Sequence, residues 1–119
     1  MSLLLSILKQ DRYQKERELA ELQDCQRELA NLQDELIQQQ SRVGEPELSP
    51  NTWHGARANE FNGSREDMTD AYRDISKTQM NRAQDEVEQK IGQILQQLGY
   101  LEHQIAAERR RMEKEEEGA

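Results

Sequence analysis

The sequence is poor in the residues that fill a globular core. Only 34% of its 119 residues are hydrophobic and 4% are aromatic, with one Trp and one Phe. Leu, Ile, Val and Phe together number 22 of 119, below the level of roughly one in five at which disorder becomes a serious alternative. A thick globular core is therefore excluded. A thin seam between helices remains possible if the few apolar residues are regularly spaced.

Other scarce residues exclude classes of function. The single cysteine, Cys25, excludes an internal disulfide, and with only His54 and His103 beside it no zinc ligand set is plausible. The six glycines are scattered, so no phosphate-binding loop is indicated. A net charge of −8 argues against nucleic acid, which requires a basic face. We expect a protein that is not an enzyme and that binds no cofactor, metal or nucleic acid.

Long hydrophobic runs are also missing. The first residues, Met1 to Leu8, are apolar, but they lack a basic leader and a cleavage site, so we expect no Sec signal peptide. No run approaches the roughly 20 apolar residues of a membrane span. We therefore expect no stable membrane insertion.

Helix-forming residues with coiled-coil spacing are abundant. Ala, Glu, Lys, Leu and Arg make up 55 of 119 residues, as is typical of coiled coils. No Pro or Gly precedes Gly44, so we predict one helix over about 3–42, about 60 Å long. Its apolar residues alternate steps of three and four, which predicts a seam facing one partner helix. The predicted seam contains Leu4, Leu8, Leu22, Cys25, Leu29, Leu32 and Leu36, with a shift to Tyr13 and Leu19 between its two parts.

A bend is predicted over 43–52. Gly44 and Pro46 end the first helix, and Ser49 followed by Pro50 is a helix-start signal. The second helix is predicted over about 50–114, longer than the first, with a frayed tail over 115–119. Residues 1–119 would then form a single domain, an all-α antiparallel two-helix hairpin. The turn signal at Gly63 leaves helix continuity there open.

Two apolar stripes follow each other along the second helix. The first contains Phe61, Met68, Tyr72 and Ile75, and the stripe shifts after Ile75, around Met80 and Ala83. The second is the most regular heptad of the chain, and its residues are Val87, Ile91, Ile94, Leu98, Leu101 and Ile105. In a hairpin bent over 43–52, Met1 would lie opposite about Ile94. The seam beyond Ile94 would then have no helix of this chain beside it, so we predict that it faces a partner protein.

The predicted bend contains the motif Trp53-His54-Gly55, and Trp53 has two interpretations. The ring can plug the end of the two-helix seam, where it shields apolar contacts from water. Alternatively, Trp53 forms a docking surface together with Gly55, whose missing side chain lets another backbone approach. Phe61, two turns into the second helix, is expected mainly in the core.

These residues resemble a known family. A tryptophan and a glycine in W-x-G between two long helices resemble the WXG-type helical hairpins of type VII secretion. The wider pattern of Trp53, Gly55, Ala58, Phe61 and Arg65-Glu66 is similar to the YwqH-like proteins of Gram-positive bacteria. An export signal of the class, Tyr or Phe followed four residues later by an acid, is missing, because Gln104 follows Tyr100 and Arg65 follows Phe61.

The resemblance implies an accessory role beside LXG-domain toxins. Small helical partners of this type pack along the toxin's helical LXG domain, support its folding, keep it soluble and present it for export, sometimes beside a second small helical partner. The chain would stay in the bacterial cytoplasm as a chaperone or be exported with its toxin. A self-assembling coiled coil, forming a homo-oligomer when alone, is the alternative, and a toxin immunity protein is a weaker one.

Overall fold

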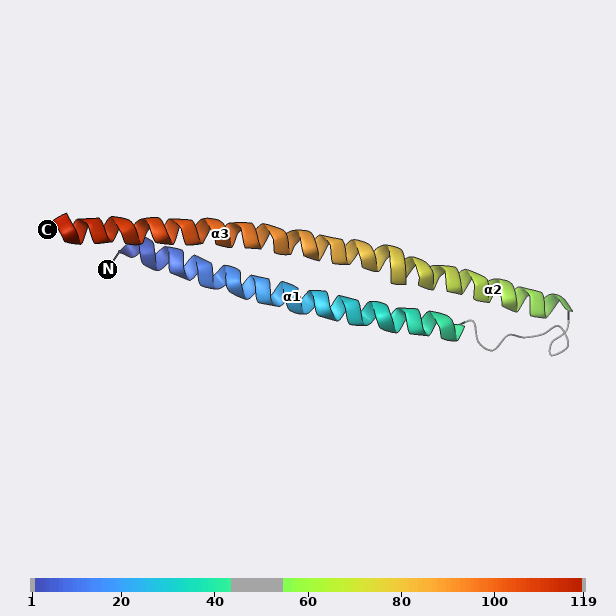
Figure 1. Cartoon of the computed structure of the whole chain (residues 1–119). Coiled ribbons are helices and arrows are strands. Elements are labelled where there is room, and N and C mark those ends of the chain that lie inside the picture. Colours follow the sequence, from blue (N-terminus) through green and yellow to red (C-terminus); the bar gives the residue numbers. More distant parts are fainter. Residues whose placement is uncertain (1, 44–54, 119) are drawn as a thin grey trace. The chain divides into compact units, whose positions relative to one another are not determined.

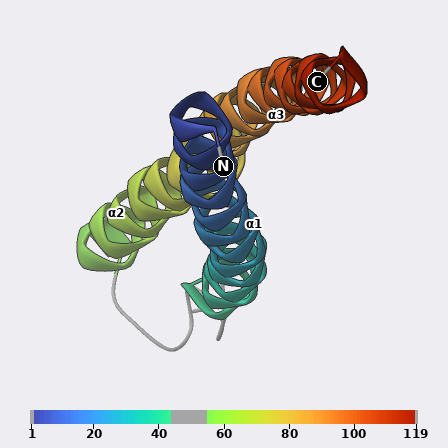
Figure 2. The same cartoon turned by 90° about the vertical axis from the view of Figure 1, so that its left-hand side faces the viewer.

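The computed structural model describes residues 2–43 and 55–118, and within them the chain is helical, with no strand. Its elements are α1 (Leu3–Val43), α2 (Gly55–Arg73), the π-helical segment η1 (Asp74–Gln79) and α3 (Met80–Gly118). The last three follow one another as one helical ribbon, from green to red in Figures 1 and 2. The predicted all-α fold, with a second helical stretch longer than the first, is confirmed.

The chain divides into two compact units. The first joins Met1–Gln26 to Val87–Ala119, and the second comprises Arg27–Glu86. Each unit pairs part of α1 with part of the later helical stretch in the opposite direction. In the first unit Ser2 contacts Glu108, and in the second Gln33 contacts Gln84 while Gln40 contacts Ser76. This antiparallel pairing is that of a helical hairpin.

The start of α1 is set by Ser2. Its hydroxyl oxygen accepts a hydrogen bond from the Leu5 amide at 3.2 Å, which is an N-cap interaction. The same hydroxyl donates to Glu108 Oε1 of α3 at 2.8 Å. One side chain therefore caps the start of α1 and also fixes which turn of α3 lies beside it.

The core of the first unit lies near the two ends of the chain. Leu5, Leu8 and Ile105 form a buried cluster, and Leu101 and Met112 pack against it. The expectation that the seam beyond Ile94 has no helix of this chain beside it is therefore wrong. The predicted seam residue Leu4 is also misplaced, because Leu4 is exposed and Leu5 takes its position.

The cause of this error can be seen in the second unit. Gln40, near the end of α1, contacts Ser76, so α1 ends beside the last turns of α2. The first turns of α2 extend past the end of α1 (Figure 1). A hairpin with Met1 opposite about Ile94 would place Gly55 opposite Gln40, whereas the observed partner of Gln40 is Ser76. The observed register is therefore shifted by roughly six turns of helix here, and by roughly four turns where Ser2 contacts Glu108. The first turns of α2 are thus an overhang that was not predicted, while α3 continues past Glu108 only to Gly118.

The helix runs unbroken through Gly63 and changes its winding at η1. The amide of Met80 donates to the carbonyls of Ile75 and Lys77, so its bond to Ile75 spans five residues. In an α-helix it would donate to Ser76, four residues back. The one extra residue accommodated by η1 coincides with the shift of the apolar stripe after Ile75 in the sequence.

Candidate interaction surface

The W-x-G motif is only partly described. Trp53 and the predicted bend over 43–52, apart from Val43, lie outside the described residues, and Gly55 is the first residue of α2. Phe61 is 40% exposed, and the guanidinium carbon of Arg65 lies 5.5 Å from its ring centroid. This geometry is that of a cation–π contact at a surface site. The expectation of Phe61 as mainly a core residue does not fit its exposure.

The regular heptad of α3 faces into the structure. Ile94 and Ile105 are each 2% exposed, and the other predicted members are half-buried, namely Val87, Ile91, Leu98 and Leu101. Since α1 covers Leu101 and Ile105, these two side chains are not on a free surface. Partner contact through this seam stays a prediction, and it would require the hairpin to open.

A buried polar cluster supports the π-helical segment. Ser76 is fully buried, and its carbonyl is the one that the Met80 amide leaves free. Gln33 Nε2 of α1 donates to that carbonyl at 2.7 Å and to Asn81 Oδ1 at 2.9 Å. Gln33 Oε1 accepts from Gln84 Nε2 at 2.9 Å. The side chain of Gln33 therefore takes the place of the missing backbone donor.

The hydroxyl of Ser76 is satisfied in the same place. It donates to Gln40 Oε1 at 3.2 Å and lies 3.4 Å from the carbonyl oxygen of Arg73. Gln33 and Gln40 were not predicted as seam residues, because the predicted seam was apolar and contained Leu32. The signal was available: Leu29, Gln33, Leu36 and Gln40 also alternate steps of three and four. In the part of α1 that belongs to the second unit, the half-buried positions are these four, and Leu32 is exposed.

A charged cluster closes the first unit. Glu108 is only 6% exposed, and its carboxylate accepts from the Ser2 hydroxyl and from Arg111, whose Nε lies 3.0 Å from Oε2. Arg111 also reaches Glu115 at 2.6 Å. Hydrogen bonds from Arg111 and Ser2 lower the pKa of Glu108 from 4.5 to about 2. The same pairing raises the pKa of Arg111 above its ordinary value. The polar groups of this cluster bond to one another, so we interpret the cluster as structural.

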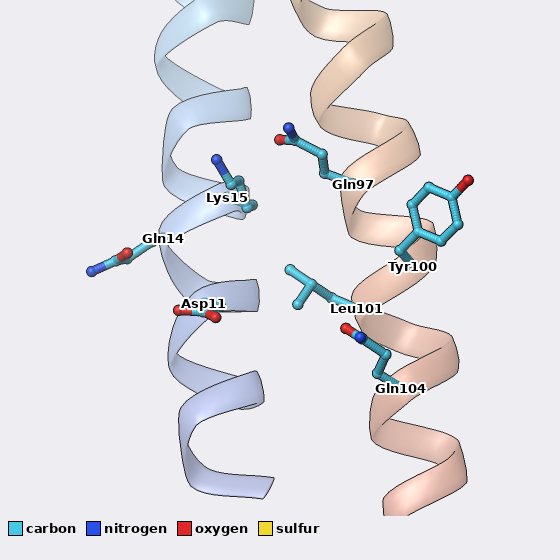
Figure 3. A pocket seen from close by; sticks show the side chains of 7 residues that line it. All are labelled: Asp11, Gln14, Lys15, Gln97, Tyr100, Leu101 and Gln104. Atoms are coloured by element: carbon cyan, nitrogen blue, oxygen red, sulfur yellow. The ribbon is translucent and has the colours of Figure 1, made fainter. Parts of the chain in front are cut away.

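An open groove lies nearby between α1 and α3 (Figure 3). Leu101 points across it toward α1, where the facing side chains are Asp11 and Lys15, and Tyr100 points away. The polar side chains that line the groove are exposed or half-buried. The groove therefore offers no buried polar group that would orient a small ligand. We interpret the groove as a gap in the apolar packing of the seam, because the polar residue Lys15 occupies a seam position there.

The second unit carries exposed apolar side chains beside its seam. Leu32 is 45% exposed, Met68 53% and Ile75 42%. Phe61, Met68 and Ile75 are spaced by seven residues and each precedes a seam residue, respectively Asn62, Thr69 and Ser76. The predicted stripe of α2 is therefore real, but apart from Tyr72, which is half-buried, it lies beside the seam and not in it.

The family model for YwqH-like proteins matches residues 5–116 of the chain. The chain belongs to the YwqH-like family. Comparison with curated proteins found no match, and comparison with solved structures found none either.

Two further searches concern the described part of this YwqH-like chain. None of its helices there combines the length and the apolar character needed to cross a membrane. No group of three His, Cys, Asp or Glu side chains in the same residues is placed to hold a metal ion.

Proposed function

We propose that this YwqH-like chain is a non-enzymatic accessory protein of type VII secretion. It binds the helical LXG domain of a secreted toxin, supports the folding of that domain and accompanies it to export. The chain acts as a chaperone in the bacterial cytoplasm and leaves the cell only with its toxin. In this proposal Trp53, Gly55 and Phe61 form the bend and docking motif that contacts the toxin.

The observation that carries the proposal is the run of exposed apolar side chains beside the seam of the second unit. Exposed apolar residues at heptad spacing are typical of a helix that awaits another helix. Met68 and Ile75 have this spacing, seven residues apart, and Leu32 of α1 is exposed as well, although the seam next to them is already closed. The seam of the second unit is thus already packed within the chain, and exposed apolar side chains remain beside it.

The proposal is tested with the purified full chain and the helical domain of an LXG toxin encoded in the neighbouring gene. Light scattering coupled to size exclusion should give one copy of each protein in a stable complex. Co-expression should also raise the soluble yield of the toxin domain. Absence of a complex at concentrations well above those in the cell would overturn the proposal for that toxin.

The same measurement separates the two alternatives. A self-assembling coiled coil would give a stable homo-oligomer of the chain alone, with no change when the toxin domain is added. An immunity protein would bind the toxic catalytic domain and not the helical domain. Either result would replace the accessory function.

A further inference from the structure

We propose that one flank of the second unit is the docking surface for a partner helix whose apolar face is bordered by lysine or arginine. The flank consists of Leu32 of α1 with Met68 of α2 and Ile75 of η1. This inference rests on the proposed function, because it names the surface and the chemistry of the partner helix that such an accessory protein binds.

The three apolar side chains lie on the same side of the helix pair. Each comes one residue before a seam residue: Leu32 before Gln33, Met68 before Thr69 and Ile75 before Ser76. One residue turns a helix by about 100°. In two antiparallel helices that face each other, this turn directs the preceding residues of both helices to the same side of the seam. The flank therefore combines side chains from both helices.

The π-helical segment places this stripe beside the seam. Extending the heptad of α3 backward without a change in winding would put Lys77 and Asp70 in the seam and Ile75 and Met68 two residues away, facing outward. The one extra residue in η1 brings Ser76 and Thr69 into the seam instead. Ile75 then lies on the flank beside α1, and Met68 lies on the same side one heptad further along the helix.

Acidic residues border the flank on both helices. On the return helix an exposed acid precedes each apolar residue of the stripe: Glu60, Asp67 and Asp74, spaced by seven. On α1 exposed Glu28 and Glu35 lie four residues before and three residues after Leu32, so both adjoin it on the helix surface. Among the described residues, no salt bridge is formed by Glu28, Glu35 or Asp67. Arg42, at the next position of the α1 column, ends the acidic border.

This charge pattern selects the occupant. A helix with an apolar face and lysine or arginine beside it would pair with both acidic columns and cover the apolar line between them. A second copy docked through the same flank would set these acidic columns against each other, which costs free energy. Anionic membranes are repelled for the same reason. We therefore assign the flank to a basic-bordered helix of a partner protein.

The surface is tested first with two designed peptides and the full chain. Both peptides carry the same leucine heptad and are equally helical, one with lysine beside the apolar face and one with glutamate. In fluorescence anisotropy at low salt, we expect the lysine peptide to bind at least tenfold more tightly. Met68→Asp and Leu32→Asp should each weaken it at least tenfold. Leu95→Asp, an exposed change in the other unit, should leave the affinity unchanged.

A charge reversal makes the test independent of apolar contact. In the double variant Glu35→Lys and Asp67→Lys both side chains are exposed, so the fold should persist, as circular dichroism would check. This variant should reverse the preference and bind the glutamate peptide more tightly. Equal binding of the two peptides, no binding of either, or an unchanged preference after the reversal would each overturn the proposed surface.

The toxin domain separates this inference from the function on which it rests. If the domain binds wild type and Met68→Asp equally well, the flank is wrong while the accessory function stands. If the domain does not bind at all, but the lysine peptide binds through the flank, the surface stands and the function fails for that toxin. Binding of the domain that Met68→Asp abolishes and Leu95→Asp preserves supports both.

Discussion

The side-chain amide of Gln33 donates to the main-chain carbonyl of Ser76 across 2.7 Å, so one side chain of α1 completes the backbone bonding of η1. Ser76 is fully buried, which makes an unpaired carbonyl there costly. The bond also fixes the register of the second unit. A polar residue at a single seam position is a known way to specify helix register.

Removal of the Gln33 amide should therefore destabilise the protein. For Gln33→Leu we expect a loss of about 1–3 kcal/mol in the free energy of unfolding, because a buried acceptor is left unpaired. Urea denaturation followed by circular dichroism measures this. Gln38→Leu is the matched control, since Gln38 is exposed on the same helix and should change stability by less than about 0.5 kcal/mol. Equal effects at the two positions would show that the Ser76 bond does not stabilise the fold.

Deletion of Thr78 should convert η1 into ordinary α-helix. One residue fewer lets the backbone return to bonds that span four residues, and Thr78 is exposed, so no core contact is lost. The Ser76 carbonyl then regains a backbone donor. In the deletion background, Gln33→Leu should cost less than half of its cost in wild type. A double-mutant cycle measures this coupling, and independent, additive effects would contradict the role given to Gln33.

The core of the first unit should depend on Ile105. Ile105→Ala removes a side chain that is 2% exposed beside Leu5 and Leu8, and we expect a loss of about 2–5 kcal/mol. Leu3→Ala, at a residue that is 77% exposed, should stay within about 0.5 kcal/mol. Thermal melts of the two variants at equal protein concentration provide the comparison. A free C-terminal seam would instead make Ile105→Ala nearly neutral for the isolated chain.

Acid should weaken the first unit through Glu108. Its folded-state pKa of about 2 lies below the ordinary 4.5, so its contribution is present above about pH 4.5 and is lost as the pH falls toward about 2. Glu108→Gln should lower the midpoint of thermal unfolding at neutral pH. It should also flatten the dependence of that midpoint on pH within this window. Thermal melts of wild type and Glu108→Gln at neutral pH check the first effect. Melts at several pH values between about 2 and 6, the range in which Glu108 titrates, check the second. An unchanged slope in Glu108→Gln would assign the acid sensitivity to other carboxylates.

The sequence allowed the fold class to be predicted, and the reasons can be named. The heptad from Val87 to Ile105 has no interruption, so its inward face could be identified without the structure. The shift of the stripe after Ile75 was also visible, and it marks η1. Periodicity is a local property, and these features depend on residues within a few turns of each other.

The register and the polar seam residues could not be predicted in the same way. Register depends on where the return helix starts to pair with α1, and helix signals at Gly44 and Pro50 do not fix that position. The choice of Leu32 over Gln33 rested on the assumption that a seam contains apolar residues. Gln33 is in the seam because η1 frees a carbonyl at Ser76, a need that arises only after both helices are placed.

The central claim is that α1 closes on α3 in the register given by Ser2 and Glu108, which fills the seam from within the chain. Spin labels on exposed sites test it in a Cys25→Ser background, with Leu3→Cys paired either with Arg109→Cys or with Glu88→Cys. In this register Arg109 lies almost level with Leu3, whereas Glu88 is displaced along the helix by about 28 Å. Pulsed electron paramagnetic resonance should therefore give a distance for the pair at 3 and 109 that is shorter by more than about 10 Å. A shorter distance for the pair at 3 and 88 would contradict the register and return the seam beyond Ile94 to a free surface.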